Sequence, residues 1–163
     1  MLIPIDNSNF ECYFNLSQHY EADFSSLTGK RPNSRGLYDV TSIHPTHPGY
    51  LWILSDGTPA GFIVVDTGKE RLDIAEFYVI PTERNKGLGR KIAFAVFDKY
   101  PGKWQVRQIS SAEEAHAFWV SVISQYTSGD FTNATEPDEE WGRVQIQKFI
   151  SSNSKLGVKG GEY

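Results

Sequence analysis

The stretch from Ile80 to Lys91 joins a strand pattern to a helix pattern, and it limits the possible folds more than any other segment. It gathers cations and glycines where the helix begins: Arg84, Lys86, Gly87, Gly89, Arg90 and Lys91. The helix macrodipole favours anions at this end, and each cation there costs about 0.3–1 kcal/mol. An anion bound by these side chains and by the free backbone amides explains the arrangement. The sequence therefore predicts a phosphate site here, with an ordinary solvated turn as the alternative.

Three strand patterns precede this junction. Hydrophobic residues dominate 50–54 and 60–66, and Asp56-Gly57 between them is a strong hairpin signal. A third strand pattern runs from Arg71 to Ile80. Short turns between successive strands predict an antiparallel meander leading into the basic glycine loop.

The remaining patterns alternate between helix and strand. Ser8-Asn9-Phe10-Glu11 has the form of a capping box, and the helix that it opens, single or broken near His19, ends before Gly29. The other predicted elements are strands at 1–5, 103–109 and 143–150, a short strand from Phe131, and helices from Gly87 to Tyr100 and about 112–125. The order β-α-β-β-β-α-β-α-β-β indicates a single α+β domain over residues 1–150. The Ser-, Gly- and Lys-rich segment 151–163 is expected to be a mobile tail.

Length and charge narrow the function. A chain of 163 residues is long enough for one domain, which buries roughly 70% of its unfolded surface. The net charge of −4 argues against a general nucleic-acid binder. The basic cluster at 84–91 is therefore local, as expected for a small anionic ligand.

The sequence does not predict a disulfide, a metal site, a signal peptide or a membrane span. Cys12 is the only cysteine, so the chain has no internal disulfide. His44 and His47 have no Cys, Asp or Glu close by in sequence, which favours a loop over a metal site. The N-terminus lacks the pattern of a signal peptide, and no segment has the roughly 20 apolar residues of a membrane span. We expect a cytoplasmic protein without a membrane or nucleic-acid partner.

Two adjacent segments carry a resemblance to a known family. Glu76-Phe77-Tyr78-Val79-Ile80-Pro81 precedes Arg84-Asn85-Lys86-Gly87-Leu88-Gly89-Arg90. Together they resemble the signature of the GNAT superfamily of acetyl-CoA-dependent N-acetyltransferases, Arg/Gln-x-x-Gly-x-Gly/Ala after a strand that ends near Val-x-Pro. The element order extends the resemblance over roughly residues 1–150. It implies a mixed, mostly antiparallel sheet of about six to seven strands, with helices on both faces.

The resemblance also implies a cosubstrate, acetyl-CoA, and no metal. Its pyrophosphate is expected on the loop that follows the strand: Arg84, Asn85, Lys86, Gly87, Leu88, Gly89 and Arg90. Its pantetheine arm is expected to pair with the backbone of Phe77, Tyr78 and Val79, like an added strand. Other phosphate loops fit less well, because the Gly-Lys-Ser/Thr of a Walker loop is absent and a Rossmann loop belongs to a parallel unit.

The resemblance implies that a neutral amine attacks acetyl-CoA directly in a ternary complex, after the protein has removed a proton from the ammonium. Asp73 and Glu76 are the candidate bases, both on the strand that leads into the loop. Residues three apart point to opposite faces of a regular strand, so without a bulge only one of them faces the substrate. Glu76 precedes an apolar run and is the preferred base, and Asp73 remains the alternative.

The proton donor for the leaving thiolate is less defined. Many family members have a tyrosine on the second helix where this chain has Trp119, and an asparagine where it has Ala112. An indole does not protonate a thiolate, so Tyr126, Tyr78 and water remain as candidates. The departures also leave open a non-catalytic acyl-CoA-binding regulatory module of the same fold.

The resemblance implies a small-molecule amine or a protein amino group as the acceptor, and a homodimer is a further expectation. The late segment 129–142 is expected to border the acceptor pocket. It is acidic, with Asp130, Glu136, Asp138, Glu139 and Glu140. This charge suits a cationic acceptor, although an ordinary solvated loop is the favoured interpretation.

Overall fold

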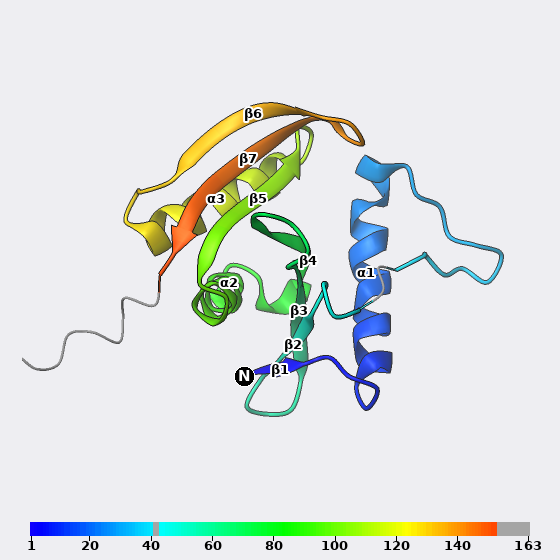
Figure 1. Cartoon of the computed structure of the whole chain (residues 1–163). Helices are drawn as coiled ribbons and strands as arrows, with labels where there is room; N and C mark the ends of the chain where they lie inside the picture. Colours follow the sequence, from blue (N-terminus) through cyan, green and yellow to red (C-terminus); the bar gives the residue numbers. More distant parts are fainter. Residues whose placement is uncertain (41–42, 153–163) are drawn as a thin grey trace, which may run out of the picture.

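A computed structural model describes residues 1–40 and 43–152, which form one mixed sheet with helices on both faces (Figure 1). The elements in chain order are β1 (Leu2–Pro4), α1 (Phe10–Thr28), β2 (Gly49–Ile53), β3 (Pro59–Asp66), β4 (Leu72–Val79), a 3-10 turn (Pro81–Glu83), α2 (Leu88–Lys99), β5 (Gly102–Ile109), α3 (Glu113–Thr127), β6 (Thr132–Asp138) and β7 (Gly142–Ser151). The strands lie in the order β1-β2-β3-β4-β5-β7-β6, and β4–β5 is the parallel pair in this described sheet. The predicted α+β class and its mostly antiparallel sheet are confirmed.

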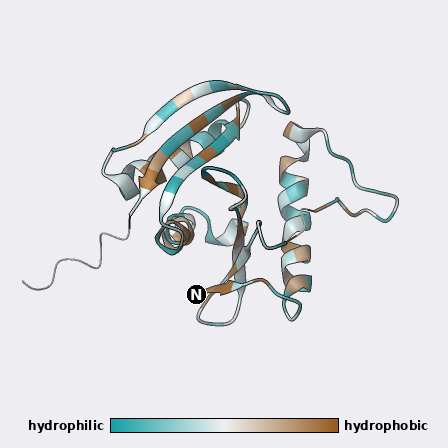
Figure 2. Ribbon diagram, viewed as in Figure 1, coloured by the Kyte–Doolittle hydropathy of each residue, from teal (hydrophilic) through white to brown (hydrophobic). Residues whose placement is uncertain are grey.

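Alternation along β3 divides the core into two layers. Ile63 and Val65 point to the layer under α2 and α3, whereas Phe62 and Val64 point to the layer under α1. Six consecutive β3 residues from Ala60 to Val65 are buried, as expected for a strand covered on both faces. Figure 2 shows hydrophobic colour along the inner strands and α2. The two faces of the sheet are therefore covered by different helices and form separate hydrophobic clusters.

The start of α1 differs from the prediction. The helix begins at Phe10 with Asn9 as its N-cap, and no side chain caps it, so the predicted capping box is wrong. Ser8 instead bonds the carboxylate of Asp6 through its amide and hydroxyl, because this local turn competes with the cap. The helix then runs unbroken to Thr28.

The last strand reaches slightly farther along the chain than predicted. β7 extends to Ser151, one residue into the segment expected to be a tail, and residues 153–163 of that segment lie outside the described part. Within residues 1–40 and 43–152, no helix is both long and apolar enough to span a bilayer.

The sheet opens between β4 and β5. These strands pair at only two positions, Leu72 with Trp104 and Asp73 with Gln105. β5 pairs with β7 along its whole length, whereas β4 beyond Asp73 pairs only with β3. The two strands therefore separate toward their carboxyl ends, and Figure 1 shows α2 and α3 on one side of this opening with α1 on the other.

A β-bulge shapes β4 at the start of this opening. Val64 pairs with Glu76 and Val65 with Ile74, which leaves Ala75 as an extra residue. The bulge shifts the alternation, so Asp73 and Glu76 point to the same α1 side of the sheet. The restriction expected for a regular strand, that only one carboxylate faces the substrate, does not apply here.

Candidate functional site

The junction between β4 and α2 has the backbone of an anion site. Asn85 (φ 61°) and Gly87 (φ 81°) both adopt the left-handed conformation, and successive amides in such turns converge. Gly87 is the N-cap of α2 and has no side chain to cap it. The first helical bond runs from the Lys91 amide to the Gly87 carbonyl over 3.2 Å. The amides of Leu88, Gly89 and Arg90 precede that bond and point out of the helix end.

The predicted cations do not all point to this junction. Arg84 turns back to β4 and α1: its Nε donates to the Val79 carbonyl over 2.8 Å, and its Nη2 lies 3.2 Å from the Asp23 carboxylate. Lys86 pairs with Glu83 at 3.4 Å on the exposed surface. Arg90 donates to the neutral Gln125 side chain over 3.0 Å and so keeps its uncompensated charge. Arg84 thus links the loop to β4 and α1, while the Arg90 guanidinium lies near Gly87 at the helix start.

Gly89 is required by close packing. A Cβ atom at Gly89 would lie 3.0 Å from the ring of Phe118 and 3.3 Å from that of Phe77. These two rings stack at 5.4 Å, and Trp119 packs against Phe77 at 5.0 Å. Aromatic side chains of α3 therefore contact β4 across the opening and bring the start of α2 close to the strand.

Beyond Asp73, the edge of β4 that faces the opening has no strand partner within the described sheet. The Ile80 amide bonds the Ala60 carbonyl, so by antiparallel alternation Tyr78 and Glu76 also face β3. Phe77 and Val79 consequently face away from β3, and the Val79 carbonyl accepts the Arg84 side chain. Of the three residues predicted to pair with a pantetheine arm, the structure directs the backbone of Phe77 and Val79 toward the opening and that of Tyr78 toward β3.

Glu76 is buried on the α1 side of the opening. It is only 4% exposed, and the hydroxyl of Tyr13 donates a 2.7 Å hydrogen bond to its Oε2. Burial raises the pKa of Tyr13 well above its ordinary value, so this phenol remains a donor. Nothing in the sequence spacing links a tyrosine on the first helix to a carboxylate 63 residues later, and the sequence did not identify this partner.

Asp73 is the second carboxylate on this side. Its Oδ2 accepts hydrogen bonds from Gln105 at 3.0 Å and Arg107 at 2.7 Å, whereas its buried Oδ1 has no hydrogen-bond partner in the described residues. Burial raises the pKa of Asp73, and Arg107 opposes that shift. Arg107 also reaches Asp138 at 3.2 Å, so it ties β4 to the turn between β6 and β7.

Tyr126 lies away from these groups. Its hydroxyl donates to Asp98 at 2.8 Å and lies 2.9 Å from the hydroxyl of Ser151. Ser151 pairs with Gly102 at the start of β5, which is the closed end of the opening. Burial raises the pKa of Tyr126 to about 12. The structure therefore does not bring Tyr126 together with Glu76.

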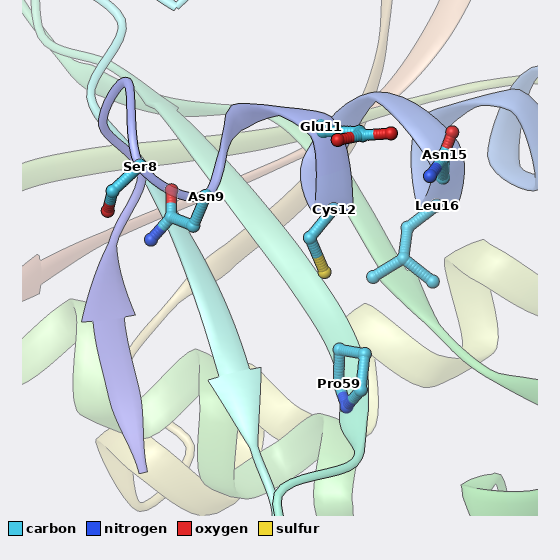
Figure 3. A pocket seen from close by; sticks show the side chains of 7 residues that line it. All are labelled: Ser8, Asn9, Glu11, Cys12, Asn15, Leu16 and Pro59. Carbon is cyan, nitrogen blue, oxygen red and sulfur yellow. The ribbon is translucent and has the colours of Figure 1, made fainter.

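A surface pocket of the described residues lies elsewhere. It lies at the start of α1, beside the end of the β2–β3 hairpin, as Figure 3 shows. Its lining consists of Ser8, Asn9, Glu11, Cys12, Asn15, Leu16 and Pro59. None of the groups at the opening line it, so the candidate site rests on backbone and strand geometry and not on this pocket.

Comparisons with known proteins agree with this geometry. The acetyltransferase (GNAT) family model matches residues 12–120. No curated protein matches the chain significantly. The ribosomal-protein-S18-alanine N-acetyltransferase of Escherichia coli shares 15% identity at a TM-score of 0.60, covering 99% of this chain and 96% of that one. The spermidine N-acetyltransferase of Vibrio cholerae, solved with CoA and spermine, shares 10% identity at a TM-score of 0.60, covering 94% and 96%. At such low identity, these structures show the shared fold alone.

Proposed function

The chain belongs to the GNAT acetyltransferase family, and on this premise we propose that it moves the acetyl group of acetyl-CoA to a primary amine by direct attack in a ternary complex. The observation that carries the proposal is the opening between β4 and β5, which ends at the uncapped start of α2. A free strand edge and a set of helix-terminal amides suit the two halves of coenzyme A. When bound, this cosubstrate supplies an acetyl group already activated as a thioester.

The donor half of the site is assigned to α2 and β4. The residues proposed to hold the pyrophosphate are Asn85, Lys86, Gly87, Leu88, Gly89 and Arg90, through amides at the helix start and two nearby cations. Arg84 supports the loop from β4. The outward backbone groups of Phe77 and Val79 are proposed to bond the pantetheine arm, and the Val79 amide is proposed to polarise the thioester carbonyl.

The acceptor half is assigned to the α1 side. Glu76 is proposed to take the proton that the ammonium must lose before attack, directly or through a water. Asp73 remains the alternative base, but its bond to Arg107 favours a structural role. The thiolate leaves with a proton from Tyr78 or water, because Tyr126 is held at the closed end.

The first test is binding. Acetyl-CoA should raise the melting temperature of the protein, and Gly87→Glu should abolish that rise by placing a carboxylate beside the phosphate amides. Gly57→Glu is the matched control, because Gly57 has a similar φ of +88° in the β2–β3 turn. A wild-type protein without any shift at saturating acetyl-CoA contradicts the donor assignment.

The second test is turnover, measured as thiol release with a panel of amines. The panel should contain spermidine and an alanine-bearing peptide with a free amino group, chosen after the names of the structural relatives. Glu76→Gln should lower kcat by about 10²- to 10⁴-fold, the usual contribution of a general base. Equal activity of Glu76→Gln and wild type would remove Glu76 from the mechanism.

A regulatory acyl-CoA-binding module is the second candidate function. The buried Trp119, at the position where the family often has a tyrosine, favours it. This candidate predicts a melting-temperature rise with acetyl-CoA but no thiol release with any amine in the panel. The two assays together therefore separate the catalytic proposal from the regulatory one.

A further inference from the structure

We propose that Tyr13 is a positioning residue that keeps the Glu76 carboxylate ionised and oriented toward the acceptor side. This inference rests on the proposed function, because it assigns a partner to the proposed base. Its starting point is the 2.7 Å hydrogen bond from the Tyr13 hydroxyl to Glu76 Oε2. The bond joins the first helix to the strand that borders the opening.

The contact is buried and rigid. Tyr13 has no exposed surface and Glu76 is 4% exposed. The Tyr13 ring meets Phe62 edge-on at 5.1 Å and Phe10 at 5.6 Å, so neighbouring aromatic rings fix its position. A hydroxyl held in this way confines the carboxylate that it bonds.

The surroundings make the bond electrostatically important. Tyr20 and Glu21 of α1 face the same buried region and raise the pKa of Tyr13 further, while β3 contributes the uncharged Phe62. Asp73 lies on the same side of β4, where Arg107 pairs with it. Glu21 pairs with Lys30 at 3.1 Å. Tyr13 is thus a neutral donor to Glu76 within a largely acidic neighbourhood.

A donor to the ionised form of a carboxylate favours that form. Removing the Tyr13 hydroxyl should therefore make Glu76 ionise at higher pH, and the acid limb of the pH profile of kcat/KM should move upward. A charge-assisted hydrogen bond predicts a move of about one pH unit. A residue that served only the fold would change stability without moving this limb.

The kinetic test compares pH profiles of wild type, Tyr13→Phe and Tyr20→Phe. Tyr20→Phe is the matched control, because it removes the hydroxyl of a partly buried tyrosine on the same helix whose ring also packs on Phe62. Tyr13→Phe should move the acid limb up by about one unit while Tyr20→Phe leaves it in place. In a Glu76→Gln background, Tyr13→Phe should have no further effect on kcat. Superimposable profiles, or an equal effect of Tyr13→Phe in both backgrounds, overturn the inference.

A second measurement does not depend on turnover. Carbon NMR of the full chain labelled at glutamate carboxyls identifies the Glu76 signal as the one lost in Glu76→Gln. Its titration midpoint should rise by about one unit in Tyr13→Phe. If the titration midpoint rises but the protein releases no thiol with any amine, the Tyr13–Glu76 coupling is supported and the proposed catalytic function is rejected. An unchanged midpoint rejects the coupling whatever the activity.

Discussion

Gly61 shows how one residue sets the geometry of β4. A Cβ atom at this position would lie 2.3 Å from the Tyr78 carbonyl oxygen, a backbone atom that a rotamer change cannot move. We predict that Gly61→Ala lowers the free energy of unfolding by about 1–3 kcal/mol, the range typical of overpacking. Urea unfolding measures this change. Gly68→Ala is the control, since its nearest contacts are 3.4 Å away, and equal effects of the two substitutions would contradict the prediction.

Asp73 gives a pH-dependent prediction. Its pKa in the folded state is raised, mainly by burial, so the folded protein binds this proton more tightly than the unfolded chain does. The resulting stabilisation is complete below the ordinary pKa of aspartate and is lost as pH rises through the raised pKa. The difference in unfolding free energy between wild type and Asp73→Asn should therefore shift in favour of wild type as pH falls from 7 toward 4. A difference independent of pH over this range excludes the predicted linkage.

Sequence reasoning reached some residues of the candidate site and missed others. Glu76 and the glycines of the loop stand out locally, because charge and glycine are unusual where an apolar strand passes into a helix. Tyr13 and Arg107 do not, because their roles come from contacts across 63 and 34 residues. The pairing of Arg84 with Asp23 of α1 could not be predicted for the same reason. Such long-range pairs depend on how the helices dock on the sheet.

At the scale of elements, the order of helices and strands was predictable because each has a clear period and a turn at its ends. The bulge at Ala75 was not, because it exists only in the pairing of β4 with β3. The predicted capping box is absent because Ser8 bonds the nearby carboxylate of Asp6 instead. Strand pairing and helix capping therefore depend on which of several possible hydrogen-bond partners is used, and a local sequence pattern does not show this.

Deleting Ala75 tests the role of the bulge. The deletion restores regular alternation and turns Asp73 from Arg107 toward the hydrophobic layer under α2 and α3. An uncompensated buried charge of this kind costs about 3–5 kcal/mol, so we expect a large fall in the melting temperature measured by circular dichroism. Deletion of the exposed Glu70 in the turn before the same strand is the control and should cost less. A milder effect for the Ala75 deletion would show that the alternation is not essential.

At the scale of the whole molecule, the sheet consists of two parts joined by two residue pairs between β4 and β5. The free edge of β4 is expected to exchange its amide hydrogens quickly in the absence of ligand. Acetyl-CoA should slow exchange in a peptide spanning residues 74–80 by at least tenfold, on the order expected if it bonds the amides of Phe77 and Val79. Hydrogen–deuterium exchange mass spectrometry measures this, with a β7 peptide as an internal reference. Equal slowing in both peptides would indicate general stabilisation and not strand pairing.

The position of the β6–β7 hairpin has a consequence for changes in its sequence. The hairpin joins the sheet through β5, and Arg107 of β5 links its turn to β4 by pairing with both Asp138 and Asp73. The α2 loop proposed for the donor lies on other elements. Changes in the length or charge of the hairpin are therefore expected to leave the proposed donor loop in place.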